Sequence, residues 1–289
     1  MGFMDQCEQG ILLSTLSTFE IGGPARFVFK AKSISNVQEA FAWANGEGCP
    51  VFVVGHGSNC LFSDSGFAGL VIVNRIEAWH QEDRLFHVGG GHGFAAFGVR
   101  VANEGWGGVE FAAGIPGTVG GAVVMNAGAC GQQVADTLHY VDWVEMDGQF
   151  KRFAKEEIGL GYRHSAFQGK RGAIVAAGFL LNRSEEAKQR QKAMIKERVG
   201  TQPVKEKSAG CVFKNPPGAS AGRLIEEAGL KGYKIGGAEV STVHANFIVN
   251  RGGAKACEVC ELIAFIQQEV AKRSGYTLET EVKVIGDAR

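Results

Sequence analysis

The sequence lacks an excess of charge of either sign, because its 30 basic residues balance its 30 acidic residues. A chain without a net positive field has no long-range attraction for nucleic acid or for an anionic membrane surface. We therefore expect neither nucleic acid nor a membrane among its partners. Any anion that the protein binds has to be held by local groups.

Signals for export, membrane insertion and repeat architecture are also missing. The first eight residues contain two acids and no basic region ahead of a hydrophobic block, unlike a secretory signal. Residues 111–132 carry no charge and are long enough to span a bilayer, but Pro116 and several glycines interrupt them, which favours a buried loop region. No repeat of solenoid length is visible. These absences predict a folded cytoplasmic protein.

A paired cysteine framework is absent as well. The seven cysteines are odd in number and show no disulfide-type spacing, so we expect them to be reduced. Cys257 and Cys260 form a single C-x-x-C pair with no matching histidine cluster, and no metal site is predicted. Three positions apart on a predicted helix, both side chains are expected to face the core.

Glycine is the residue type in excess, with 42 among 289 residues, roughly twice the usual share of about 7%. The length favours two or three subdomains. Helical and strand patterns alternate along the chain, and Asp147-Gly148 marks a hairpin between residues 138–146 and 150–153. The other expected helices cover residues 36–45 (with Asn36 as the candidate cap), 94–105, 184–199, 221–228 and 254–273, and the other expected strands cover residues 50–54, 70–73, 173–181, 246–250 and 281–285. The fold class predicted is α+β.

Two uncharged glycine loops are the strongest local signals. Residues 55–59 (GHGSN) follow a predicted strand, but they run into Leu61 and a turn, not into the helix of a dinucleotide fingerprint. Residues 114–121 (GIPGTVGG) form the second loop. Consecutive N–H groups unobstructed by Cβ atoms can bind phosphate without a net positive field, so two such loops suit a pyrophosphate. A tight turn at the first loop and close backbone packing at the second are the alternatives.

Six segments, taken in order along the chain, resemble the UDP-N-acetylenolpyruvoylglucosamine reductases, also called UDP-N-acetylmuramate dehydrogenases. The matching segments are residues 17–26 (STFEIGGPAR), 55–59 with 64–67, 110–129, 161–165 (GYRHS), 208–216 (SAGCVFKNP) and 278–282 (LETEV). The resemblance implies a two-lobed FAD-binding domain of the vanillyl-alcohol-oxidase (PCMH) type in residues 1–183, with lobes of about 1–75 and 76–183. A C-terminal α+β substrate domain would follow in residues 184–289, and the last strand is expected to return to the first lobe.

The same resemblance implies FAD as cofactor, NADPH as cosubstrate, and reduction of a UDP-sugar, UDP-N-acetylglucosamine enolpyruvate, for peptidoglycan synthesis. The residues implied to hold the FAD pyrophosphate, or to lie near it, are Gly55, Gly57, Ser58, Asn59, Gly114, Ile115, Pro116, Gly117, Thr118, Gly120, Asn126 and Gly128. The oligomeric state stays open, and a monomer is compatible with the sequence.

Three residues match the family's catalytic positions. Arg163 would stabilise the carboxylate charge that grows as hydride adds to the enolpyruvyl double bond. Cys211 stands where many relatives carry serine, and it matches the proton donor. Glu281 precedes a valine as the family's active carboxylate does, which selects it over Glu279. A surface arginine, a buried inert cysteine and an edge-strand glutamate are the alternative interpretations.

Lys214, Asn215 and Lys231 lie in or beside family motifs and are candidate contacts to the substrate diphosphate, with solvated side chains as the alternative. No tyrosine occurs between Arg163 and Cys211, which suggests the family branch without a tyrosine-bearing loop. Two rival functions remain: another oxidase or dehydrogenase on the same flavin fold, and a nucleotide-sugar binder without flavin.

Overall fold

The computed structural model describes residues 2–286 and divides the chain into two compact units. The first unit contains Met1–Glu8, Phe27–Gly55 and Gly69–Arg198, and the second contains Gln9–Arg26, His56–Ala68 and Val199–Arg289. The boundaries of these units differ from those of the predicted domains. The second unit includes Gln9–Arg26 and His56–Ala68 together with the C-terminal residues.

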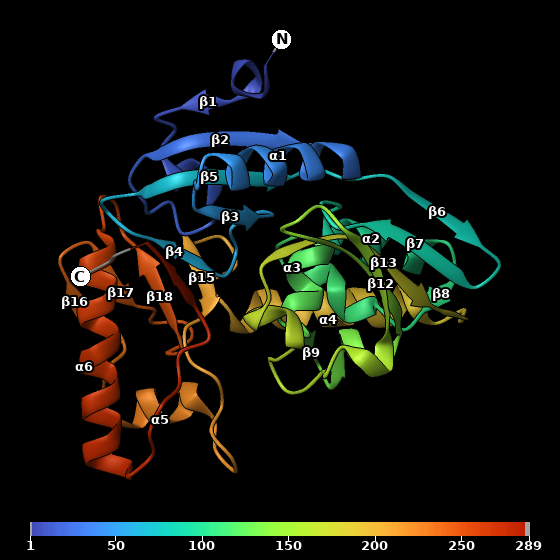
Figure 1. Ribbon diagram of the computed structural model, residues 1–289. Helices are drawn as coiled ribbons and strands as arrows, with labels where there is room; N and C mark the ends of the chain where they lie inside the picture. The colour runs from blue at the N-terminus through green and yellow to red at the C-terminus, as the bar shows by residue number, and fades with distance from the viewer. Residues whose placement is uncertain (1, 287–289) are drawn as a thin grey trace. The chain divides into compact units, whose positions relative to one another are not determined.

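Two sheets form most of the first unit, and its segments bear out the mixed α and β pattern (Figure 1). One sheet has the order β1-β2-β5-β3, formed by β1 (Glu8–Gln9), β2 (Ala25–Ala31), β5 (Phe67–Asn74) and β3 (Val51–Val54). The other has the order β12-β11-β13-β7-β6, formed by β12 (Phe150–Ala154), β11 (Leu138–Glu145), β13 (Gly172–Leu180), β7 (Leu85–Gly89) and β6 (Trp79–Glu82).

Helices and short ribbons complete the first unit. Its helices are α1 (Ile34–Gly46), α2 (Phe94–Asn103), α3 (Val119–Val124) and most of α4 (Ala187–Thr201). Its two-stranded ribbons pair β8 (Trp106–Gly107) with β14 (Asn182–Arg183) and β9 (Gly128–Ala129) with β10 (Gln132–Gln133). Within residues 2–286, the 3-10 segments of both units are η1 (Phe3–Gln6), η2 (Leu13–Leu16), η3 (Glu110–Gly114), η4 (Val134–Asp136), η5 (Lys155–Glu157) and η6 (Ala166–Gly169).

The first unit has two hydrophobic clusters. One gathers apolar residues of β2, α1 and β5 around Phe41, and the other gathers residues of β7, α2, α3, β11 and β13 around Phe94 and Phe179. Helix α1 buries Val37, Ala40, Phe41 and Ala44, the stripe expected from the sequence. It begins earlier than expected, because the side chain of Ser33, not that of Asn36, accepts the capping hydrogen bond.

A buried ion pair fixes the segment that leads into the glycine loop of residues 114–121. Glu110 on η3 is 1% exposed and receives two hydrogen bonds from Arg190 on α4, at 3.0 and 2.6 Å. The backbone N–H of Gly108 donates to its other oxygen at 2.6 Å. Burying a carboxylate is favourable only when its oxygens are paired in this way. The loop therefore starts from a rigid anchor.

The second unit contains one antiparallel sheet with two helices, around an apolar cluster of its own (Figure 1). The sheet has the order β15-β18-β17-β16, formed by β15 (Ser208–Cys211), β18 (Phe247–Asn250), β17 (Ala238–Val240) and β16 (Lys234–Ile235). Helix α6 (Ala256–Ser274) packs against β16, β17 and α5 (Ala221–Glu227).

The last strand, β19 (Lys283–Ile285), pairs in parallel with β4 (Cys60–Phe62). Strand β4 follows directly on the glycine loop of residues 55–59, so no helix of the dinucleotide-binding kind enters there, as the sequence indicated. Close by along the chain, Asp64 accepts hydrogen bonds from the N–H groups of Ala256 and Cys257 at the start of α6.

The cysteines are free, as expected, but one expectation about them is wrong. Cys257 is exposed, because it lies in the first turn of α6 on the side opposite the buried residues Ala256 and Val259. Cys260 is half-buried and packs against the core.

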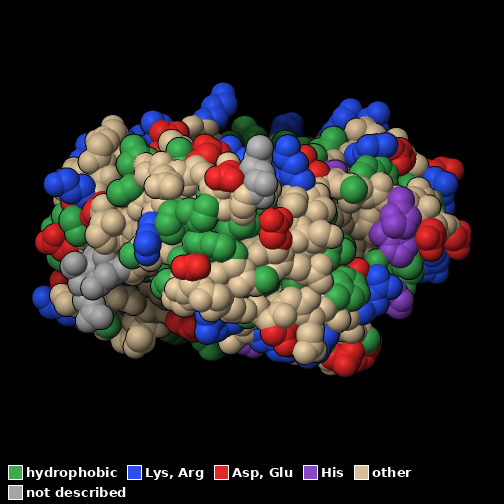
Figure 2. Space-filling model, turned by 45° about the horizontal axis from the view of Figure 1, so that its top comes forward, with side chains coloured by type: hydrophobic (Ala, Val, Ile, Leu, Met, Phe, Trp, Pro, Cys, Tyr) green, Lys and Arg blue, Asp and Glu red, His purple; other side chains and the backbone are tan. Residues whose placement is uncertain are grey.

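Basic and acidic side chains are interspersed on the face shown in Figure 2, in keeping with their equal numbers. Within residues 2–286, no helix is long and apolar enough to cross a bilayer. The uncharged stretch of residues 111–132 instead forms η3, α3 and part of the β9–β10 ribbon, and its apolar side chains join the core around Phe94.

Candidate functional site

Gly55 and Thr118, from the two predicted phosphate loops, lie against each other in the first unit. Gly55 directly follows β3, and a Cβ atom added to it would lie 2.2 Å from Oγ1 and 2.8 Å from Cγ2 of Thr118. Thr118 is 3% exposed, so it has little room to move away. Only glycine permits this approach of the two loops.

The loop of residues 114–120 is held by backbone hydrogen bonds on one side. The N–H groups of Val119 and Gly120 donate to the carbonyls of His92 and Gly90, at 2.9 and 2.8 Å. Gly120 is therefore a point of close backbone contact, and its N–H group is already used. Ile115 is likewise bonded, to the carbonyl of Ala112 at 2.8 Å.

Two N–H groups of this loop remain for a ligand. Among the described residues, none accepts a hydrogen bond from the backbone N–H of Gly117 or Thr118. Gly117 has a φ of +120°, a conformation that favours glycine, and the Thr118 side chain caps α3 by accepting from Gly121 at 3.5 Å. Gly114 ends η3, and the residues from Ile115 to Thr118 form the loop that leads into α3.

Asn126 holds the neighbouring segments together. Its side chain is buried, donates to Gln133 Oε1 and to the Gly161 carbonyl at 2.9 and 2.8 Å, and accepts from the Ala135 N–H at 2.9 Å. Both N–H donors of the amide and one acceptor position of its oxygen are thus used within the protein. Its predicted place near the cofactor is compatible with a positioning role more than with direct contact.

Arg163 is positioned by its backbone and by its guanidinium. Its φ is +52°, uncommon for a residue with a side chain, within the turn formed by Gly161 and His164. Nη2 donates to the Gly128 carbonyl at 2.9 Å, and Gln168 donates to the Arg163 carbonyl at 3.0 Å. Strained backbone that is held in place in this way is typical of functional sites.

In the second unit, residues 56–59 form a braced turn. Gly57 has a φ of +61°, and an added Cβ would lie 2.1 Å from the carbonyl oxygen of Leu16. Ser17 Oγ lies 3.4 Å from the Gly57 carbonyl and 3.3 Å from that of Cys60. Ser58 and Asn59 therefore occupy a backbone that other segments hold in place.

The same unit brings the segments of Cys211 and Glu281 together. The N–H of Glu281 donates at 2.7 Å to the carbonyl of Val212, the residue after Cys211, and Asn59 Nδ2 donates to the Glu281 carbonyl at 3.1 Å. The register of β15 with β18 shifts between Ser208 and Cys211, an irregularity of the bulge type that redirects a side chain. Cys211 and Glu281 are both half-buried.

Asn246 holds the Cys211 segment from the other side. It is buried, accepts from the Phe213 N–H at 2.9 Å and donates to the Phe213 carbonyl at 2.8 Å. Its own N–H donates to Nδ1 of His244 at 3.2 Å, which requires that nitrogen to be unprotonated. Burial, and to a smaller extent the charge of Lys231, lower the pKa of His244.

The predicted substrate residues are distributed around this unit. Lys214 and Lys231 form ion pairs with exposed carboxylates, Glu279 at 2.5 Å and Glu226 at 2.8 Å. Asn215 Oδ1 accepts from the Ala221 N–H at the start of α5. Partly exposed ion pairs are weak, so both lysines can exchange partners for a phosphate.

Sequence reasoning missed three positioning residues: Ser17, Gln168 and Asn246. Ser17 stands in a matching segment (residues 17–26), yet nothing in the sequence shows that its hydroxyl reaches residues 40 and 43 positions away. Gln168 lies three positions after the matching segment of residues 161–165, and Asn246 lies outside the matching segments. Their roles depend on tertiary contacts that no local spacing encodes.

Comparisons with known proteins cover both units. Residues 25–154 match the family model of an FAD binding domain, and residues 202–285 match that of the C-terminal domain of UDP-N-acetylenolpyruvoylglucosamine reductase. The reductase of that name from Protochlamydia amoebophila is 47% identical over 286 residues, covering 99% of this chain and 96% of its own. The one from Chlamydia muridarum is 44% identical, covering 96% and 94%. The crystal structure of the Thermus caldophilus reductase has a TM-score of 0.83 at 38% identity, covering 96% of this chain and 98% of that one.

Proposed function

This chain belongs to the UDP-N-acetylenolpyruvoylglucosamine reductase family, and we propose that it reduces UDP-N-acetylglucosamine enolpyruvate to UDP-N-acetylmuramate with NADPH, for peptidoglycan precursor synthesis. The observation that carries the proposal is the match over nearly the whole chain, which includes both the FAD-binding and the C-terminal domain. A rival flavin oxidase would lack the second match.

FAD fits the two glycine loops, residues 55–59 and 114–120. The N–H groups of Gly117 and Thr118 have no acceptor among the described residues, and Gly55 leaves no Cβ in the way. A pyrophosphate would supply acceptors to an uncharged loop. We assign Gly55, Gly57, Ser58, Asn59 and the loop of residues 114–120 to FAD, with Asn126 and Gly128 as support. When bound, FAD supplies the hydride chemistry.

Arg163 is proposed to hold the enolpyruvyl carboxylate. Hydride addition at the vinyl carbon pushes electron density into this carboxylate, and a fixed cation lowers the energy of that charge. The bond to the Gly128 carbonyl and the turn at Gly161 support the assignment, because they fix the guanidinium before substrate arrives. Preorganised charges cost no reorganisation during the reaction.

Cys211 is proposed to donate the proton to the carbon next to the new C–H bond. A free thiol with a pKa of about 8.5 is a stronger acid than an alcohol and is mostly protonated at neutral pH. Glu281 would help to stabilise the enol-like intermediate. The hydrogen bond from Glu281 to Val212 supports a shared role, since it ties the two segments together.

Lys214, Asn215 and Lys231 are proposed to bind the substrate diphosphate. From the sequence resemblance we also propose a flavin domain in residues 1–183, a substrate domain in residues 184–289, and membership of the family branch without a tyrosine loop. A cytoplasmic location is supported by seven free thiols and by the need for NADPH.

One experiment tests the proposed reaction. Purified protein is first extracted with acid and the released cofactor identified, with FAD as the expected result. The protein is then incubated with NADPH and the enolpyruvyl nucleotide sugar, and the molecular mass of the product is measured by mass spectrometry. We expect a product that has gained two hydrogens. A colourless protein that cannot be reconstituted with FAD, and that binds the nucleotide sugar unchanged, would show a binding protein instead.

A further inference from the structure

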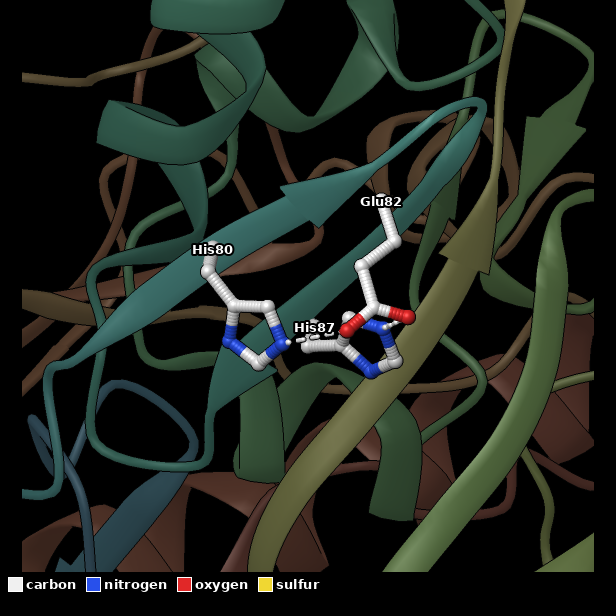
Figure 3. Close-up of side chains that lie close together, drawn as sticks. All are labelled: His80, Glu82 and His87. Atoms are coloured by element: carbon white, nitrogen blue, oxygen red, sulfur yellow. Dashed lines mark ion pairs between the residues drawn. The ribbon is translucent and has the colours of Figure 1, made fainter.

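Two histidines and a glutamate meet on the hairpin of β6 and β7 in the first unit (Figure 3). His80 and His87 are directly opposite each other in the antiparallel register. Glu82 lies two positions after His80, so it is on the same face of β6. Figure 3 shows the Glu82 carboxylate beside the His87 ring, with ion pairs to both histidines. Their candidate ligand atoms all lie within 4.8 Å of one another.

Two nitrogen–oxygen distances in this cluster are close to the ligand–ligand distance of a tetrahedral zinc site. Nε2 of His80 is 3.4 Å from Glu82 Oε1, and Nε2 of His87 is 3.5 Å from Glu82 Oε2. Two ligands each about 2.0–2.1 Å from a tetrahedral zinc ion lie roughly 3.3–3.4 Å apart. Each imidazole therefore lies at a suitable distance from one of the two oxygens of the Glu82 carboxylate.

His87 has a buried nitrogen with no hydrogen bond and a partner for its other nitrogen. Within the part of the chain that the structure describes, Nε2 of His87 is buried without a hydrogen-bond partner. Nδ1 is hydrogen-bonded to the Tyr140 hydroxyl. A ring that donates from Nδ1 carries its lone pair on Nε2, as histidines bound to metals do.

From this cluster we propose that His80, Glu82 and His87 bind one divalent transition-metal ion of the zinc type. Two imidazoles and one carboxylate suit Zn²⁺, Ni²⁺ or Cu²⁺, whereas Mg²⁺ and Ca²⁺ require a shell of oxygens. Water would complete the coordination. Positive charge nearby is balanced, because Arg152, over the Tyr140 ring, is paired with both oxygens of Asp142.

The ion has an open path to the site. The side chains of His80 and Glu82 are 64% and 69% exposed. The two histidine rings are stacked, 4.3 Å apart at 16°, so His80 has to turn toward the ion, and its exposure leaves room for this. Because β6 is the edge strand of its sheet, a bound ion would clamp it to β7.

Calorimetric titration of the flavin-containing protein, stripped of metal with a chelator, tests the proposal. We expect one Zn²⁺ per chain and no heat from Mg²⁺. His80→Ala and Glu82→Gln should each weaken Zn²⁺ binding about tenfold or more, and Tyr140→Phe should weaken it by roughly 10–100-fold, the range for outer-shell partners. Zn²⁺ should slow amide exchange in β6 of the parent protein.

Matched variants identify the ligands. His139→Ala removes an exposed histidine on β11 of the same sheet and should leave affinity unchanged. Cys257→Ser with Cys260→Ser removes the C-x-x-C pair and should also leave it unchanged. Since His80 is exposed, its variant should fold and retain flavin. Equal Zn²⁺ affinity in the parent and His80→Ala proteins, or loss of binding in the cysteine variant, would overturn the assignment.

Discussion

Nη2 of Arg163 donates a hydrogen bond to the carbonyl oxygen of Gly128 at 2.9 Å, and this contact fixes the guanidinium on a turn with unusual backbone geometry. A lysine would keep the charge but would lose the planar set of donors. It cannot bond the Gly128 carbonyl and also present a fixed fork to a carboxylate.

We therefore expect Arg163→Lys to slow flavin reoxidation by the enolpyruvyl substrate by roughly 10²-fold or more, as when one charge-stabilising donor is lost. Flavin reduction by NADPH should change much less. Stopped-flow absorbance measures the two half-reactions, flavin reduction and flavin reoxidation, separately. Arg223→Lys, at an exposed arginine of α5, is the control. If Arg163→Lys slowed flavin reduction and flavin reoxidation equally, Arg163 would have a structural role.

The contact of Gly55 with Thr118 predicts a loss of cofactor. In Gly55→Ala the new Cβ would meet Oγ1, Cγ2 and Cβ of Thr118 at 2.2 to 3.0 Å, so turning the Thr118 side chain gives no relief and the loop has to shift. We expect lower FAD occupancy, measured by absorbance at equal folded content. Gly46→Ala, at the end of α1 with open space around it, should retain the parent occupancy.

Cys211 tests the proposed proton transfer. Cys211→Ala should leave NADPH reduction of the flavin nearly intact and slow reoxidation by substrate by roughly 10²-fold or more, as expected for a positioned acid. Cys211→Ser should recover part of the loss, since many relatives carry serine there. Cys260→Ala, at another half-buried cysteine of the same unit, is the control. A Cys211→Ala protein with parental turnover would rule out this donor.

His244 predicts a pH dependence of stability. Its pKa in the folded protein lies below the ordinary value of 6.5, so the unfolded chain binds more protons as the pH falls below about 6.5. The free energy of unfolding should therefore fall from neutral pH downward, as protonation removes the acceptor for the Asn246 N–H. His244→Asn keeps an acceptor and no charge, so its decline, followed by urea unfolding, should be shallower. An identical pH profile would contradict this role.

Much of the fold follows from local signals, and the exceptions have identifiable causes. Helix α1 and the hairpin around Gly148, whose φ is +85°, form where periodicity and turn chemistry place them. Strand β6 is exposed and polar, and its turn uses Asp83 at a φ of +54° where no glycine signals it. For this reason the hairpin that places His80 opposite His87 could not be predicted from the sequence.

Some residues of the candidate site could be predicted from the sequence, and others could not. Glycines that cannot accept a Cβ, such as Gly55 and Gly57, could be predicted because their residue type carries the signal. The pairing of the Cys211 and Glu281 segments could not be predicted from spacing, because it depends on a contact between residues about 70 positions apart. Here the resemblance to a family supplied what local patterns could not.

The most direct test of the proposed function follows the bound flavin without oxygen. NADPH is added to the purified protein until the absorbance of oxidised flavin is lost, excess NADPH is removed, and the enolpyruvyl nucleotide sugar is added. We predict that this substrate restores the oxidised spectrum in proportion to the UDP-N-acetylmuramate formed. A flavin that NADPH cannot reduce, or that only oxygen can reoxidise, would contradict the account.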